Sequence, residues 1–233
     1  MPDNKFLPYN LQFIVLSEFF RLNPAPNEFK KEKLRQWFWV TSFVGLDTPN
    51  ASKTGWVIDE MKKFAKSDET DFQFKMVDFS EEAQPFPNRF NLISARVRAY
   101  VLFLLSLDPK SLNGESFNPD DALKLGYKAL PYIISRGGRL SNRILLGSVK
   151  KYGFAKKALK NKKNLFEDHL TSEVLASHGI TQEALNAIQN GNDELFLELR
   201  EKELIRIERE FMVSKGVVPN ASLDTSEPLN DTE

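Results

Sequence analysis

Two histidines carry the only imidazole groups of the chain, so they are the first candidates for a base or a metal ligand. His169 directly follows Asp168, and a neighbouring carboxylate can orient an imidazole as a general base. His178 comes nine residues later, which is not the i,i+4 spacing by which one helix presents two metal ligands. Because Gly179 follows His178, we expect this histidine to close a helix, where an imidazole suits the dipole. An isolated histidine such as His169 is more often a cap or a surface residue than a ligand.

A long run of cations is the other feature that could do chemistry. The segment 136–163 holds ten basic residues and no acidic one. Lysines and arginines gathered on one surface bind phosphate by releasing its counterions. We take seven of them as candidate DNA contacts, namely Arg136, Arg139, Arg143, Lys150, Lys151, Lys156 and Lys157. The alternative is that the acid-rich segment 193–210 packs near the basic segment and neutralises it, since charge runs are usually solvated faces.

The composition excludes several classes of protein. The chain has 233 residues, 41% of them hydrophobic, and its formal net charge is zero, so it is not a globally basic coat protein for nucleic acid. It has no cysteine, which excludes a disulfide framework, thiolate zinc ligands and a cysteine nucleophile. No Walker A, GxGxxG or GxSxG motif is present. The start has no signal-peptide pattern and the longest apolar run is Tyr100–Leu105, so we expect a cytoplasmic protein that does not contact a membrane.

The elements that must position these residues are mostly helices. Apolar residues at three- to four-residue spacing predict helices over 10–22, 28–44, 56–66, 90–107, 150–159, 172–177, 181–189 and 193–212. Phe72, Phe74 and Met76 alternate with polar residues, which predicts a strand. Short apolar runs at 132–134 and 144–146 flank Gly137-Gly138 and are compatible with a hairpin. The acidic end of the chain, 216–233, is expected to be disordered.

The order of several segments resembles a known bacterial family. The segments are FLPYNLQ at 6–12, FFRL at 19–22, LRQWFW at 34–39, SNRILL at 141–146, LASHGI at 175–180 and FLELR at 196–200. This order is similar to the C-terminal half of large bacterial proteins that join a ParB-like N-terminal domain to a C-terminal HNH-type domain, among them the GmrSD restriction endonucleases. The resemblance covers about residues 6–212 and does not include the ParB-like domain.

The resemblance implies a ββα-metal nuclease site, and its residues are only partly kept. The family's His-His-Ile-Phe-Pro stretch falls on 127–131, where Lys128 stands in the place of the general base and Pro131 is retained. The family's first asparagine is kept as Asn142, although an asparagine there also makes local turn hydrogen bonds. The second asparagine falls near Lys151, and a Mg²⁺ site built from lysines is electrostatically unfavourable. The pattern therefore predicts a degenerate site without metal or cofactor.

These observations predict a mainly α protein with a small β element. We expect a helical segment over 1–110, a degenerate ββα HNH-like core over 111–165, C-terminal helices over 166–215 and the acidic tail. The expected function is that of a DNA-associated, non-catalytic member of a bacterial restriction and phage-defence nuclease family. Two alternatives stay open: an active endonuclease that uses Mg²⁺ or another divalent metal with His169 and Asp168, or an interaction subunit. The expected partners are DNA and a separately encoded ParB-like domain protein.

Overall fold

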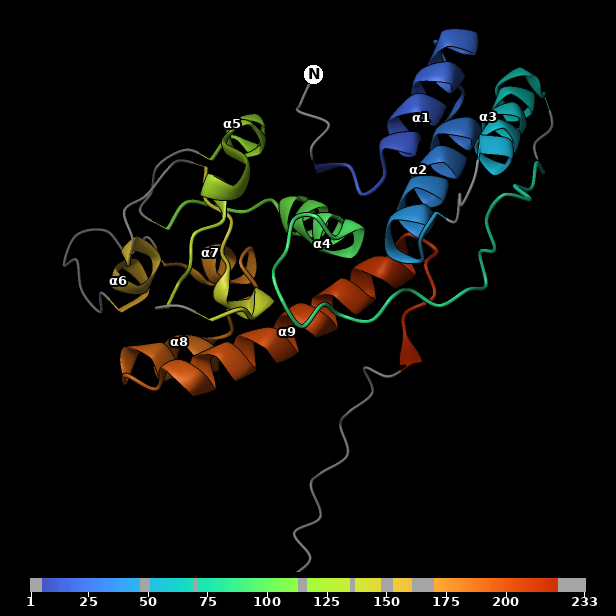
Figure 1. The fold of residues 1–233 in the computed structure, drawn as a ribbon. Coiled ribbons are helices and arrows are strands. Elements are labelled where there is room, and N and C mark those ends of the chain that lie inside the picture. The colour runs from blue at the N-terminus through green and yellow to red at the C-terminus, as the bar shows by residue number, and fades with distance from the viewer. Residues whose placement is uncertain are drawn as a thin grey trace, which may run out of the picture. The chain divides into compact units, whose positions relative to one another are not determined.

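The fold is mainly helical, as the sequence predicts. The computed structural model describes residues 6–46, 51–68, 71–112, 117–134, 137–147, 153–160 and 170–221 (Figure 1). The α-helices are α1 (Asn10–Leu22), α2 (Glu28–Phe43), α3 (Ala51–Lys66), α4 (Ala95–Ser106), α5 (Pro119–Leu125), α6 (Phe154–Lys160), α7 (Ser172–Ala176), α8 (Gln182–Gln189) and α9 (Asp193–Ser214). Two short 3₁₀ helices, η2 (Gly126–Ala129) and η3 (Leu140–Asn142), lie in the middle of the chain. Within the described ranges no helix is long and apolar enough to span a bilayer.

The chain divides into two units, and both are discontinuous in sequence. Unit 1 consists of residues 1–13 and 87–211, and unit 2 consists of residues 14–86 and 212–233. The division predicted from the sequence is different, because each of its segments is continuous in the chain: 1–110, 111–165 and 166–215. This division stays a prediction. The end of the chain also differs from its expected disorder where the structure describes it. Val217 is buried, and the N–H of Ala83 donates to the carbonyl of Val218 at 2.8 Å.

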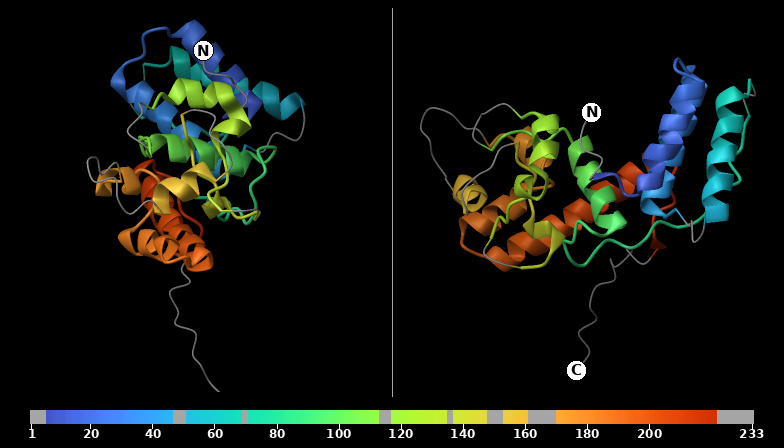
Figure 2. Two further views of the ribbon diagram at one scale, coloured as in Figure 1. Left: turned by 90° about the vertical axis from the view of Figure 1, so that its left-hand side faces the viewer. Right: turned by 45° about the horizontal axis from the view of Figure 1, so that its top comes forward.

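Unit 2 is built from the side-by-side helices α1, α2 and α3 (Figure 2). Asn27 caps α2 by accepting a hydrogen bond from the N–H of Lys30 at 2.9 Å. The buried ammonium of Lys30 reaches the carbonyl of Ala65, near the end of α3, at 3.0 Å. The ring of Phe64 lies 5.6 Å from that of Phe19 and therefore joins α3 to α1.

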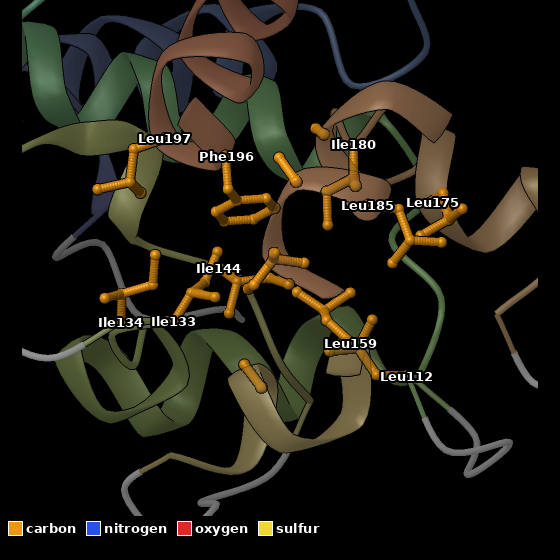
Figure 3. Packing of buried hydrophobic residues seen from close by; sticks show 14 of the residues in the cluster. Leu112, Ile133, Ile134, Ile144, Leu159, Leu175, Ile180, Leu185, Phe196 and Leu197 are labelled. Carbon is orange, nitrogen blue, oxygen red and sulfur yellow. The ribbon is translucent and has the colours of Figure 1, made fainter. Parts of the chain in front are cut away.

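Unit 1 carries a bidentate ion pair between α4 and α9. Arg96 donates to both carboxylate oxygens of Glu208, at 2.8 Å and 2.6 Å, and both side chains are buried. Closer to the amino end of α9, the shorter helices surround an apolar cluster (Figure 3). Ile133, Ile144, Leu159, Leu185 and Phe196 belong to this cluster, so it joins the segments before and after η3 to α6, α8 and α9.

The described residues contain no β-strand or sheet, so the strand predicted at 72–76 is wrong. The rings of Phe72 and Phe74 instead lie 4.9 Å and 4.8 Å from the ring of Phe64. The predicted hairpin at 132–134 and 144–146 is reduced to one antiparallel bridge between Tyr132 and Arg143. The ββα core is not formed as regular secondary structure in this part of the chain, because the two segments share only this isolated bridge, with η3 between them in sequence.

Candidate functional site

The family asparagine, Asn142, is a buried hydrogen-bonding residue of the irregular hairpin. Its Oδ1 accepts from the N–H of Ile134 at 2.8 Å, and its Nδ2 donates to the carbonyl of the same residue at 3.3 Å. Its own carbonyl accepts from the N–H of Ile133 at 2.9 Å. The amide side chain therefore takes the place of a backbone partner where the two segments cannot form a ladder. These bonds join residues eight positions apart across the hairpin, so they differ from the local turn hydrogen bond that the sequence suggested for Asn142.

The side chain of Arg143 is only 3% exposed and lies among aromatic rings. Its guanidinium carbon is 3.4 Å from the ring centroid of Tyr132, 4.8 Å from that of Tyr127 and 4.7 Å from that of Phe90. It also donates to the Tyr127 hydroxyl at 2.6 Å and to the Leu130 carbonyl at 2.7 Å. These cation–π and hydrogen-bond contacts hold Arg143 inside the protein. Arg143 is therefore not accessible to a phosphate, which corrects its place among the candidate DNA contacts.

Arg200 of α9, which is not one of the candidate phosphate contacts, joins the hairpin to the turn after α7. Its guanidinium is buried and donates to the carbonyls of Ser141 and Arg143, the latter at 2.9 Å. It also donates to the carbonyl of His178 at 3.1 Å and 3.0 Å. Burial lowers the pKa of Arg200 to about 10, so the group is still charged at neutral pH. Phe196 and Leu204, each four residues away and buried, place it on the buried stripe of the helix.

His178 is a buried, neutral residue rather than a charged helix cap. Its Nε2 lies 2.7 Å from the carbonyl of Lys110, and because a carbonyl only accepts, Nε2 donates. Burial lowers the pKa of His178 to about 4, and the charge of Arg200 acts in the same direction. Gly179, next in the chain, has a φ of +63° and lies against Leu204, where a Cβ would approach within 2.6 Å.

Two of the candidate phosphate contacts are paired with acids of α9. Lys156 of α6 donates to the carboxylate of Asp193, and Arg139 lies 2.8 Å from the carboxylate of Glu194. The acidic last helix thus neutralises part of the basic segment, in agreement with the second interpretation of the charge run. Both contacts are at the start of α9, where carboxylates also complement the helix dipole.

Lys157 and Lys160 of α6 lie at the surface of unit 1. Neither has an ion pair among the residues that the structure describes. The buried side chains of Ala155 and Leu159 hold the other side of this short helix in the apolar cluster. The helix therefore presents its two ammonium groups to solvent next to the paired Lys156. Lys157 is one of the candidate phosphate contacts. Lys160 is three residues later on the same helix, so it lies next to Lys157 on the exposed face.

Of the remaining candidate residues, only Lys128 lies within the described part of the chain. Lys128, at the position of the family's general base, is exposed in η2, so its ammonium is solvated. Arg136, Lys150, Lys151, Asp168 and His169 lie outside the described residues. Over the described ranges, no group of three or more His, Asp or Glu side chains is placed to hold a metal ion.

No family model, curated protein or solved structure matches the chain. The family resemblance therefore rests on the sequence segments alone and stays a prediction.

Proposed function

We propose that this chain is a DNA-associated, non-catalytic member of the bacterial restriction and defence nuclease family that its sequence resembles. In this proposal the protein contacts DNA phosphates through α6, with Lys157 and Lys160 as the first contacts. The observation that carries the proposal is the exposure of these two ammonium groups on one short helix, within a segment that has ten bases and no acid. Each phosphate neutralised by a lysine releases counterions and adds to affinity without reading sequence.

We also propose that the hairpin and α6 form a degenerate ββα core. Backbone hydrogen bonds join Leu146 to Ala129 at 2.8 Å and Ile144 to Pro131 at 3.3 Å. Two antiparallel extended segments followed by a helix have the chain order of a ββα motif. In this proposal Lys128 replaces the general base, and a solvated ammonium does not deprotonate water. Plasmid nicking with Mg²⁺ or Mn²⁺ that is lost in His169→Ala would overturn the non-catalytic assignment.

The main experiment is duplex binding over a salt series from about 50 to 300 mM. The variant Lys157→Ala/Lys160→Ala should bind more weakly and reduce the log–log salt slope by about 0.9 for each lost contact. Lys202→Ala is the matched control, because Lys202 is an exposed lysine on the acid-rich α9. Affinity that is unaffected by salt, or equal losses in the two variants, would contradict the proposal.

A second candidate function, an interaction subunit, is favoured by an apolar groove in unit 2. The groove has a volume of about 670 Å³ and is lined by Leu16, Phe20, Leu34, Phe38 and Trp39, among others. Phe20 is 47% exposed and lines this groove, so part of its ring is open to a partner. The partner in this reading is the separately encoded ParB-like domain protein.

The interaction is tested with that purified protein by size-exclusion chromatography. Phe20→Ala should weaken the complex by about tenfold or more if the side chain anchors the interface. Ile93→Ala is the control, because Ile93 is the most exposed of the large apolar residues in the described ranges and belongs to unit 1. Two proteins that elute separately would contradict this candidate.

A further inference from the structure

A second, polar pocket lies in unit 2, between α3 and the segment that follows it. Its volume is about 670 Å³, within the range of small-ligand sites. Trp56, Glu60 and Lys63 line it from the helix, and Asp71, Phe72, Gln73 and Lys75 line it from the following segment. None of these residues takes part in the sites described above.

The spacing in α3 explains how the helical wall forms. Trp56, Glu60 and Lys63 are four and three residues apart, so they share one face of the helix. Oε1 of Glu60 accepts a hydrogen bond from the backbone N–H of Lys75 at 2.5 Å, which holds the second wall along the helix. The rings of Phe72 and Phe74 lie against that of Phe64 in the core. The pocket is therefore formed by packed structure rather than by a single surface loop.

Glu60 brings a buried acceptor to this pocket. The residue is only 7% exposed, and its Oε2 has no hydrogen-bond partner among the described residues. A buried carboxylate oxygen without a donor is unfavourable, so native structures nearly always supply one. Solvent does not reach this oxygen, so a ligand N–H group would satisfy it only after the Glu60 side chain turns toward the pocket.

Trp56 and the two lysines add the other chemistry of the pocket. The indole of Trp56 is 46% exposed, which leaves an aromatic surface for stacking. Lys63 and Lys75 are exposed, and they line the pocket from α3 and from the segment after it. Their charges suit a phosphate, which a lysine binds as a point charge.

We propose that this pocket binds a nucleotide. Its base would stack on Trp56 and donate an N–H to Glu60, and its phosphate would lie between Lys63 and Lys75. Other ligand classes leave part of the pocket unsatisfied. A purely cationic ligand would be repelled by Lys63 and Lys75, and a simple anion would be repelled by Glu60 and Asp71. An apolar ligand would leave Oε2 of Glu60 without a donor. The nucleotide is either free or one unit of a single strand, and it does not depend on the α6 proposal.

The test uses the full-length protein and tryptophan fluorescence. Trp37 is fully buried and Trp39 is partly buried, so Trp56 is the indole best exposed to a stacking ligand. Deoxyguanosine monophosphate should quench the emission saturably, and it should bind more tightly than deoxyribose 5-phosphate, which has no base to stack. The absence of saturable quenching below about 10 mM nucleotide, or equal affinity for the two ligands, would overturn the proposal.

Variants test the contacts of Trp56, of Glu60 and of the two lysines separately. Calorimetry measures binding in the Trp56 variants, because they lack the fluorescent indole. Trp56→Ala should weaken binding by about tenfold or more, and Trp56→Phe should retain it within about threefold. Lys63→Ala/Lys75→Ala should weaken binding of the nucleotide but not of the nucleoside. The isosteric Glu60→Gln should lower the preference for the nucleotide over deoxyribose 5-phosphate. Unchanged binding in Trp56→Ala would overturn the proposal even if other variants fold poorly.

Two further arms identify the source of the nucleotide and keep this proposal separate from the first. A tetranucleotide that binds at least about tenfold more tightly than the mononucleotide assigns the pocket to single-stranded nucleic acid, and equal affinities assign it to free nucleotide. Lys157→Ala/Lys160→Ala should leave mononucleotide binding unchanged. A loss in that variant would overturn the assignment to this pocket, whereas a failure of duplex binding leaves it unaffected.

Discussion

Lys156 of α6 donates a hydrogen bond to Asp193, the first residue of α9. This contact joins the basic segment to the acid-rich helix, and the ion pair of Arg139 with Glu194 is its neighbour. A phosphate that approaches α6 must therefore compete with a carboxylate for Lys156, whereas Lys157 and Lys160 are exposed. The acids at the start of α9 lower the positive charge that DNA would meet.

Replacing the acid partner should strengthen DNA binding. Asp193→Asn removes one negative charge with little change in shape and releases Lys156. We expect duplex affinity to rise about two- to fivefold and the salt slope to steepen by up to about 0.9. Fluorescence anisotropy over a salt series measures both. Glu198→Gln removes an exposed acid of the same helix away from these pairs and should change affinity less. Equal effects of the two changes would show that only net charge matters.

Asn142→Ala should destabilise the protein without changing its affinity for DNA. The substitution leaves the buried N–H and carbonyl of Ile134 without their side-chain partner. We expect the free energy of unfolding in urea to fall by about 2–4 kcal/mol. Asn91→Ala removes an exposed turn hydrogen bond to Ile93 and should cost about 1 kcal/mol or less. A stable Asn142→Ala variant with weakened DNA binding would instead indicate a direct role at the DNA.

The ion pair between Arg96 and Glu208 should be sensitive to the loss of one partner. Arg96→Met leaves a buried carboxylate unpaired, so we expect a loss of about 3–5 kcal/mol in the free energy of unfolding. Arg96→Met/Glu208→Leu removes both charges and should recover much of this loss. Arg206→Ala disrupts exposed pairs on α9 and should cost about 1 kcal/mol or less. A double variant no more stable than Arg96→Met would argue against an electrostatic cause.

His178 should make stability fall as the pH is lowered. Burial holds the pKa of the folded-state imidazole at about 4, whereas an unfolded histidine has a pKa near 6.5. Above about pH 6.5 both states are neutral and this residue adds no pH dependence. Between about pH 6.5 and 4 the unfolded chain takes up the proton first, so up to about 3 kcal/mol is lost.

Urea unfolding at several pH values from about 7 to 4.5 measures this loss. His178→Gln keeps a donor for the carbonyl of Lys110 and cannot titrate, so its stability should change less with pH. The difference between the two proteins removes the contribution of the carboxylates, which titrate in both. If the free energy of unfolding of the two proteins changed equally with pH, His178 would not be the cause of the pH dependence.

The sequence predicted most of the helices because their patterns are local, but it did not predict α5, and the predicted starts of α3 and α4 are five residues from the observed ones. Asn27 before α2 and Pro24 after α1 mark helix ends within a few residues of the observed bounds. The alternation at 72–76 failed for a physical reason. Phe72 and Phe74 do point to a common neighbour, Phe64, but a strand also needs a partner strand, and alternation alone does not supply one.

The interior of the site was less predictable. In the sequence, Arg200 is one of four bases in an acidic helix, which suggests an exposed side chain. The apolar residues four positions away on either side, Phe196 and Leu204, are buried and indicate that Arg200 lies on the buried face. The burial of Arg143 depends on rings from three separate positions, and sequence spacing does not bring those rings together. His178 was expected near a helix end and follows α7, but its contact with Lys110 is long-range.

The pairing of Ala83 with Val218 has a consequence for synthesis on the ribosome. The helices of unit 2 and Ala83 are synthesised first, and Val218, the backbone partner of Ala83, follows 135 residues later. At about 5–20 residues per second, the interval lasts on the order of ten seconds. During that time the N–H of Ala83 lacks its partner in the folded protein, so unit 2 completes this contact only after residue 218 has been made.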